Sequence, residues 1–190
     1  SLFNRLAGRR ISIVDPTPGV TRDRVTTILE LNPPPDRSDE EPRFVEIMDT
    51  GGYGIYAAEG GQIDDAGKDL ALLTPDIEAQ IYKAAHDAEL ILFVIDARDG
   101  VMPLDERVAK LIRTAGLSQK VVPIANKVDD PSWDADGFEA AALGFGQPLL
   151  VSATSGYGSK RLLETVWERL EKSSAGEQPE VPEVRFAIVG

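Results

Sequence analysis

The segment "NKVD", from Asn126 to Asp129, combines side chains that can read a purine base. Asn126 can hydrogen-bond a purine edge, the stem of Lys127 can lie along a ring, and the carboxylate of Asp129 can accept two N–H donors. Guanine presents such a pair of donors and adenine does not. The segment therefore selects guanine.

Two further segments stand where apolar runs end. In "SAT", residues Ser152, Ala153 and Thr154 can offer backbone N–H groups to the guanine oxygen. In "IMDTGGY", Asp49 can hold Mg²⁺ through water, and Gly52 lets the backbone approach a phosphate. An Asp-Gly turn after a strand is also common without any ligand. The segment "IMDTGGY" alone therefore does not indicate a nucleotide site.

A fourth segment, "PGVTRDR", places Thr21 in a loop before the first predicted strand. Its hydroxyl could reach a metal ion, and its N–H could reach a terminal phosphate. Any one of the four segments could arise by chance. All four in this order favour a guanine-nucleotide fold.

Apolar runs must position these segments. The runs "LILFVIDA" from Leu90, "VVPIAN" from Val121 and "PLLVSA" from Pro148 are nearly continuous, which is typical of parallel strands buried on both faces. Helical patterns beginning near Thr74 and Pro103, and a third around Leu162, separate or follow them. Strands that alternate with helices predict an α/β fold with a parallel sheet.

The upstream part has a different pattern. "VTTILEL" (25–31) and "RFVEIMD" (43–49) predict two strands, joined by the proline-rich, acidic "NPPPDRSDEEP", which we expect to be a mobile hairpin loop. Residues 54–73 are rich in Gly and Asp, and a connection of that length is usually functional or disordered.

Composition excludes several classes of function. The 190 residues contain no Cys and one His, so disulfides, thiolate metal sites and histidine clusters are excluded, and a cytoplasmic location is expected. The net charge of −12 argues against strong RNA binding by this domain, and no apolar run is long enough for a membrane helix. Five arginines near the N-terminus form either a solvated face or a phosphate-facing patch: Arg5, Arg9, Arg10, Arg22 and Arg24.

The segments "SLFNRLAGRRISIVDPTPGVTRDR", "DTGGY", "ELILFVIDARDGVMPLDERVAKLIR" and "NKVD" resemble the first GTPase domain of the EngA (Der) family, tandem bacterial GTPases of ribosome assembly. The resemblance implies a P-loop NTPase-like three-layer sandwich, with a mostly parallel six-stranded sheet and one antiparallel edge strand. It implies GTP or GDP and Mg²⁺ as ligands, with a monovalent cation as a further candidate. It also implies a ribosomal particle as the partner, in assembly of the large subunit.

The resemblance assigns roles to individual residues. Thr21 would bind the metal and the γ-phosphate in switch I, and Asp49 with Gly52 would act in switch II, Asp49 as a second metal residue. Tyr53 stands where many small GTPases carry a water-positioning glutamine, so catalysis would rely on metal ions and backbone positioning. The guanine readers would be Asn126, Lys127 and Asp129, with Ser152, Ala153 and Thr154.

The 190 residues contain no G-x-x-x-x-G-K-[ST] phosphate loop, which the family places immediately before "SLFN". That loop supplies charge-assisted hydrogen bonds worth about 1.5–3 kcal/mol each, and each 1.4 kcal/mol is a factor of ten in affinity. We therefore expect at most weak guanine-nucleotide binding and impaired hydrolysis by this polypeptide.

The family's first strand is central in the sheet, and leaving its place empty would expose unpaired backbone groups. The terminal "VRFAIVG" is an apolar strand ending in glycine, like that first strand. We expect a G domain over residues 1–172, a linker over 173–183, and residues 184–190 as the first strand of a second G domain that fills the gap. It would insert in cis or by swapping from a neighbouring chain, and the alternative is a frayed tail.

Two other functions differ in class. A non-enzymatic interaction domain could keep the fold without nucleotide binding, and calorimetric titration with GDP and GTP would separate it from a GTPase. An adenine-specific phosphotransferase conflicts with "NKVD".

Overall fold

A seven-stranded sheet forms the centre of the molecule, with strand order β1-β2-β3-β7-β4-β5-β6. The computed structural model describes residues 2, 9–13, 26–49, 75–173 and 184–189. The strands are β1 (Arg9–Ile13), β2 (Thr26–Leu31), β3 (Arg43–Asp49), β4 (Leu90–Asp96), β5 (Val121–Asn126), β6 (Leu149–Leu150) and β7 (Val184–Val189). The helices are α2 (Pro75–Asp87), α3 (Pro103–Thr114), α4 (Asp134–Phe138) and α5 (Ser159–Ser173), with short 3₁₀ turns at 35–37, 118–120, 131–133 and 139–143.

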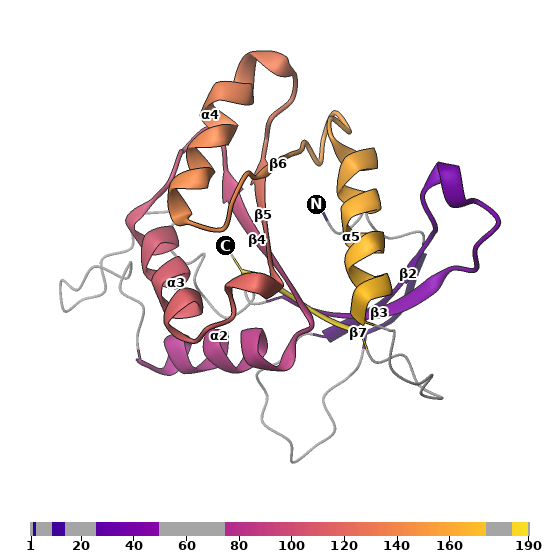
Figure 1. Cartoon of the computed structure of the whole chain (residues 1–190), viewed down its shortest axis with the longest axis horizontal. Helices are drawn as coiled ribbons and strands as arrows, with labels where there is room; N and C mark the ends of the chain where they lie inside the picture. The colour runs from indigo at the N-terminus through magenta and orange to yellow at the C-terminus, as the bar shows by residue number, and fades with distance from the viewer. Residues whose placement is uncertain (1, 3–8, 14–25, 50–74, 174–183, 190) are drawn as a thin grey trace.

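Helices cover both faces of the sheet, with α5 on one face and α2 and α3 on the other (Figure 1). This arrangement explains why β4 and β5 are apolar almost throughout, since neither of their faces meets water. Within each helix, apolar side chains recur at helical spacing toward the sheet, such as Val108 and Ile112 of α3 and Leu162, Val166 and Leu170 of α5. No helix in the described part of the chain is both long and apolar enough to cross a bilayer.

The C-terminal strand β7 lies in the middle of the sheet. It pairs in parallel with β3, from Val45↔Val184 to Asp49↔Ile188, and with β4, from Leu90↔Phe186 to Phe93↔Val189. Its neighbouring residues Ala187 and Ile188 are buried on opposite faces, Ala187 toward α2 and α3 and Ile188 toward α5. β7 therefore occupies a central position in the sheet, parallel to both of its neighbours.

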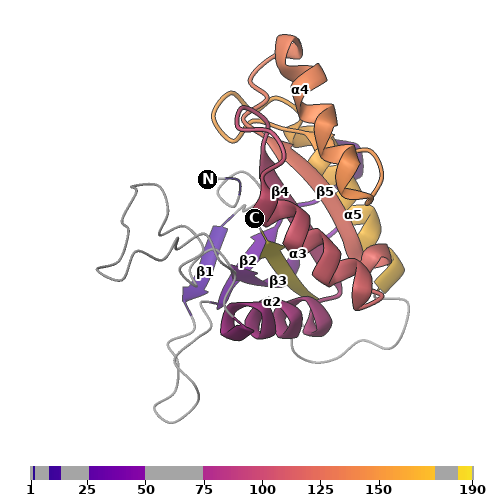
Figure 2. The same cartoon turned by 90° about the vertical axis from the view of Figure 1, so that its left-hand side faces the viewer.

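The fold class is confirmed, but the sheet has seven strands where we predicted six. The additional strand is β1, which pairs antiparallel with β2 across an irregularity between Arg10 and Ser12 (Figure 2). It takes the edge position, and β2 lies between β1 and β3, antiparallel to both. We missed β1 because a short segment starting with two arginines has no apolar run, and only its hydrogen bonds to β2 define it.

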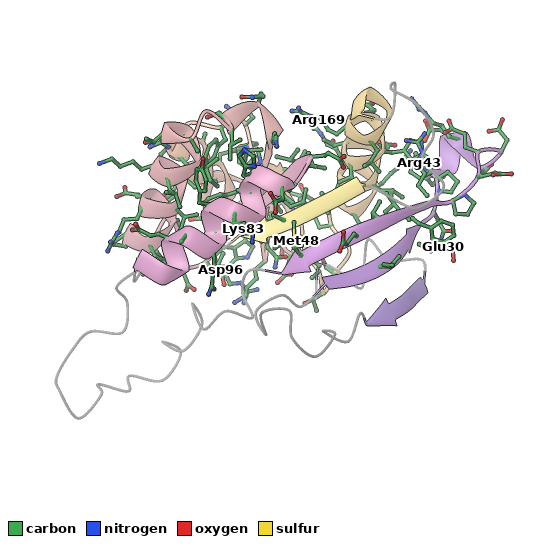
Figure 3. All side chains as sticks on the ribbon, turned by 90° about the horizontal axis from the view of Figure 1, so that it is seen from below. Glu30, Arg43, Met48, Lys83, Asp96 and Arg169 are labelled. Carbon is green, nitrogen blue, oxygen red and sulfur yellow. The ribbon has the colours of Figure 1, made fainter. Side chains whose placement is uncertain are left out.

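The connector between β2 and β3, which we predicted to be mobile, is instead held against α5. The indole Nε1–H of Trp167 donates to Glu40 Oε2 at 3.0 Å, and the Arg43 guanidinium lies 4.2 Å from the centre of the same ring. Figure 3 shows Arg43 between the hairpin and α5. Trp167 is fully buried, and a buried indole N–H needs an acceptor, which explains why this acidic loop lies against α5. Residues 54–73, for which we expected a functional or disordered loop, lie outside the described residues.

Candidate guanine-base site

The predicted base-reading segments meet at the carboxyl ends of β5 and β6. Asn126 is the last residue of β5, and its side-chain Oδ1 accepts a hydrogen bond from the N–H of Ala153 at 3.3 Å. Its backbone oxygen accepts from the N–H of Ala97 at 2.9 Å, at the end of β4. Asn126 therefore joins three adjacent strand ends at the edge of the sheet where open α/β folds bind ligands.

The backbone turns sharply after Asn126. Lys127 has a φ of 67°, in the left-handed region that residues other than glycine rarely adopt. Val128 is fully buried, and its N–H donates to Val151 O at 3.0 Å. Val128 anchors the turn in the core. Its two neighbours in the chain, Lys127 and Asp129, are therefore more exposed than Val128.

Both flanking side chains are engaged. Lys127 Nζ forms an ion pair with the carboxylate of Asp96, the last residue of β4, which Figure 3 labels. Asp129 Oδ1 accepts from Ser152 Oγ at 2.5 Å, and Asp129 Oδ2 accepts from an Arg98 guanidinium nitrogen at 2.5 Å. The carboxylate predicted to read guanine is thus fixed by one donor on each oxygen.

The loop after β6 is organised around a buried serine. Ser152 is 1% exposed, and its Oγ accepts from the N–H groups of Thr154 at 3.2 Å and Ser155 at 2.9 Å while it donates to Asp129. Ser155 Oγ donates in turn to the backbone oxygen of Asp129 at 3.0 Å. The two predicted segments therefore form one hydrogen-bonded unit.

A glycine sets the far end of this loop. Gly158 has a φ of +68°, and a Cβ there would lie 1.9 Å from the backbone oxygen of Leu150. Only glycine allows the chain to return this closely to β6 before α5 begins. The loop that carries Ser152 therefore depends on Gly158.

Two titratable groups beside the site have shifted pKa values. Hydrogen bonds from Ser132, first from its hydroxyl and then from its N–H, lower the pKa of the Asp130 carboxyl, which is therefore ionised at neutral pH. Partial burial raises the pKa of the Tyr157 phenol, and its hydrogen bond to the Asp134 carboxylate adds to the shift. Tyr157 stays neutral and braces the loop against the start of α4.

The phosphate and metal half of the predicted site is described only in part. Thr21 and Gly52 lie outside the described residues. Asp49 is the last residue of β3 and pairs with Ile188 of β7, which places its backbone at the same edge of the sheet as Asn126. No cluster of three or more metal-ligating side chains occurs in the part of the chain that the structure describes.

Sequence reasoning missed Asp96 and Arg98. Both belong to "IDARD" at the end of β4, and the β4–β5 register places Asp96 directly beside Asn126. The signal in the sequence was a carboxylate and a guanidinium two residues apart at the end of a buried strand. To connect these residues with the base site, the sequence reasoning would have needed the pairing of β4 with β5.

Comparison with known proteins gives a consistent result. The family model described as "50S ribosome-binding GTPase" matches residues 1–127. Proteins named GTPase Der are similar over the whole chain in Rhodopirellula baltica (40% identity, 37% of that protein) and Ligilactobacillus salivarius (34% identity, 38% of that protein). In Streptomyces coelicolor the likeness is 37% identity over 92% of the chain and 32% of the relative. The chain spans about a third of the length of these relatives.

Proposed function

The chain belongs to the 50S ribosome-binding GTPase family, and we propose that it is a GTP-binding switch domain whose guanine readers are Asn126, Lys127 and Asp129. The backbone N–H groups of Ser152, Ala153 and Thr154 would complete the set by exchanging their present acceptors, Tyr157 O, Asn126 Oδ1 and Ser152 Oγ, for the base oxygen. One observation carries the proposal: the Asp129 carboxylate is held between Ser152 and Arg98 at the end of β5. An ionised carboxylate is an acceptor only, so it favours a base edge that presents two N–H donors.

The phosphates and Mg²⁺ would lie on the β3 and β7 side of the base. Thr21 and Asp49 are proposed as metal residues, and Thr21 with Gly52 as the catalytic positions. Hydroxyl and carboxylate oxygens are the hard donors that Mg²⁺ prefers, and the end of β3 stands beside β7 at the correct edge of the sheet. Bound Mg²⁺ would neutralise charge on the phosphates. A monovalent cation is a further candidate ligand.

For a polypeptide of these 190 residues we propose weak nucleotide binding and slow GTP hydrolysis, because the sequence contains no lysine-bearing phosphate loop. In the wider protein we propose a role in assembly of the large ribosomal subunit in the cytoplasm. The family's description names binding to the 50S ribosome, which supports the large subunit as the partner. Residues 1–172 would be one G domain, 173–183 a linker, and 184–190 the first strand of a second G domain.

Calorimetric titration with nucleotides in the presence of Mg²⁺ tests the proposal. GDP and GTP should bind and ADP should not. No heat with any nucleotide at millimolar concentration would overturn the proposal for this polypeptide and favour an interaction domain.

Replacement of one carboxylate oxygen of Asp129 by an amide nitrogen, in Asp129→Asn, tests the role of this residue in base recognition. Xanthine carries an oxygen where guanine carries its 2-amino group, so Asp129→Asn should weaken GDP binding and favour xanthosine diphosphate, because the amide offers one donor and one acceptor. Asp136→Asn, at an exposed position on α4, removes the same charge and should leave the preference for guanine unchanged.

A further inference from the structure

We propose that Arg98 is a positioning residue for guanine recognition: it holds Asp129 Oδ2 so that the carboxylate faces the 1-N–H and 2-amino groups of the base. The inference rests on the proposed function, since it concerns the same base site. It assigns a role to a residue outside the four segments that carry the sequence prediction.

Arg98 makes three contacts. Its backbone N–H donates to Asp96 Oδ1 at 3.0 Å. Its guanidinium carbon lies 5.1 Å from the centre of the Trp133 ring. At its tip, a guanidinium nitrogen donates to Asp129 Oδ2 at 2.5 Å. A side chain held in this way has already lost most of its rotamer freedom, so it can hold a partner without a further entropic cost.

Each oxygen of the Asp129 carboxylate accepts one hydrogen bond within the chain. Ser152 Oγ occupies one lone pair of Oδ1, and Arg98 occupies one lone pair of Oδ2. A carboxylate has about four acceptor positions, so one remains on each oxygen. Two parallel acceptors are what the paired donors of guanine require, so Arg98 can stay in place while the base binds.

Asp96 links Arg98 to the other base-reading side chain. One of its oxygens accepts from the Arg98 backbone, and the other pairs with Lys127 Nζ. The end of β4 therefore organises both the residue that flanks the base and the residue that orients its reader.

An ordinary surface ion pair would not orient a binding residue, because exposed ion pairs contribute little to stability. The pair between Arg107 and Glu78 is such a case and provides a matched control. Arg107 is 45% exposed and Arg98 is 47% exposed, but the Arg107 pair spans 3.6 Å between α3 and α2 and does not involve Asp129.

Nuclear magnetic resonance of the nucleotide-free chain supplies the first test. In Arg98→Ala, the amide signals of Thr154 and Ser155 should shift, because release of Asp129 alters the Ser152 hydroxyl to which those two N–H groups donate. Arg98→Lys should restore part of the wild-type positions, and Arg107→Ala should leave them unchanged. Unchanged signals in Arg98→Ala would overturn the proposal, whether or not the chain binds nucleotide.

Discrimination between GDP and inosine diphosphate supplies the second test. Inosine lacks the 2-amino group, so the ratio of the two affinities measures the bond from that group to Asp129. Arg98→Ala should lower this ratio by about tenfold, Arg98→Lys by less, and Arg107→Ala not at all. A ratio that stays constant refutes positioning, and a ratio that rises means that Arg98 competes with the base. If the wild-type chain binds neither nucleotide, the proposed function fails, and the amide signals still decide whether Arg98 holds Asp129.

Discussion

The central position of β7 makes a quantitative prediction about stability. Ile188 is 8% exposed in the core under α5, and Ile188→Ala removes most of that buried side chain. Such truncations cost about 2–5 kcal/mol, depending on how far the surroundings collapse. Because β7 is paired on both sides and cannot shift easily, we expect about 2–4 kcal/mol.

Removing the whole strand should have a larger effect. A chain that ends at residue 183 leaves buried backbone groups of β3 and β4 without partners, and each such group costs about 1–3 kcal/mol. Since a domain has only about 5–15 kcal/mol of net stability, loss of the pairs on both sides of β7 is comparable to the total or larger. The truncated chain should therefore lack a cooperative unfolding transition.

Urea and thermal unfolding followed by circular dichroism measure both effects. Ile188→Ala should lower the melting temperature by about 4–16 °C for a chain of this length. Phe138→Ala, which truncates a side chain that is 46% exposed, serves as the control and should change it little. Wild-type stability in Ile188→Ala, or cooperative unfolding at the wild-type midpoint in the truncated chain, would refute the central role of β7.

Three further changes test other parts of the account by equilibrium unfolding. Gly158→Ala should cost at least about 2 kcal/mol more than Gly116→Ala, because both sites have a positive φ but only the first Cβ meets a backbone carbonyl; equal losses would contradict this. Trp167→Phe removes the indole N–H that holds the β2–β3 connector, and should cost about 1–3 kcal/mol and raise protease cleavage within residues 32–42; unchanged cleavage would show that the contact does not order the loop. Burial raises the pKa of the Asp105 carboxyl despite its hydrogen bond from the backbone, so the folded chain holds this proton more tightly than the unfolded chain does, and stability falls as pH rises through that window. Asp105→Asn should therefore stabilise the chain at pH 7 and lose this advantage in acid, and an advantage that grows in acid would contradict the assignment.

Local patterns were enough to predict the interior of the sheet. β4 and β5 are continuous apolar runs, and Pro75 and Pro103 stand at the first positions of α2 and α3 as expected. The insertion of β7 followed from a different argument, since a parallel sheet with an empty central position would leave backbone groups unpaired. "NKVD" and "SAT" were predictable because each ends an apolar run.

The features that were missed depend on residues far apart in the chain. Glu40 and Trp167 are separated by 127 positions, and nothing near Glu40 marks it as the acceptor for an indole. Arg98 meets Asp129 only because β4 lies beside β5. β1 exists through its pairing with β2. The side chains of the predicted arginine cluster lie outside the described part of the chain.

The most direct test of base recognition is to map nucleotide binding onto the amide signals of the chain. In the described structure the Ala153 N–H donates to Asn126 Oδ1, and guanine binding should transfer it to the base oxygen. Titration with GDP and Mg²⁺ should therefore shift Ala153 and its neighbours at 126–129 and 152–154, whereas ADP at the same concentration should not. Equal shifts with ADP, or GDP-induced shifts confined to other parts of the chain, would contradict the account.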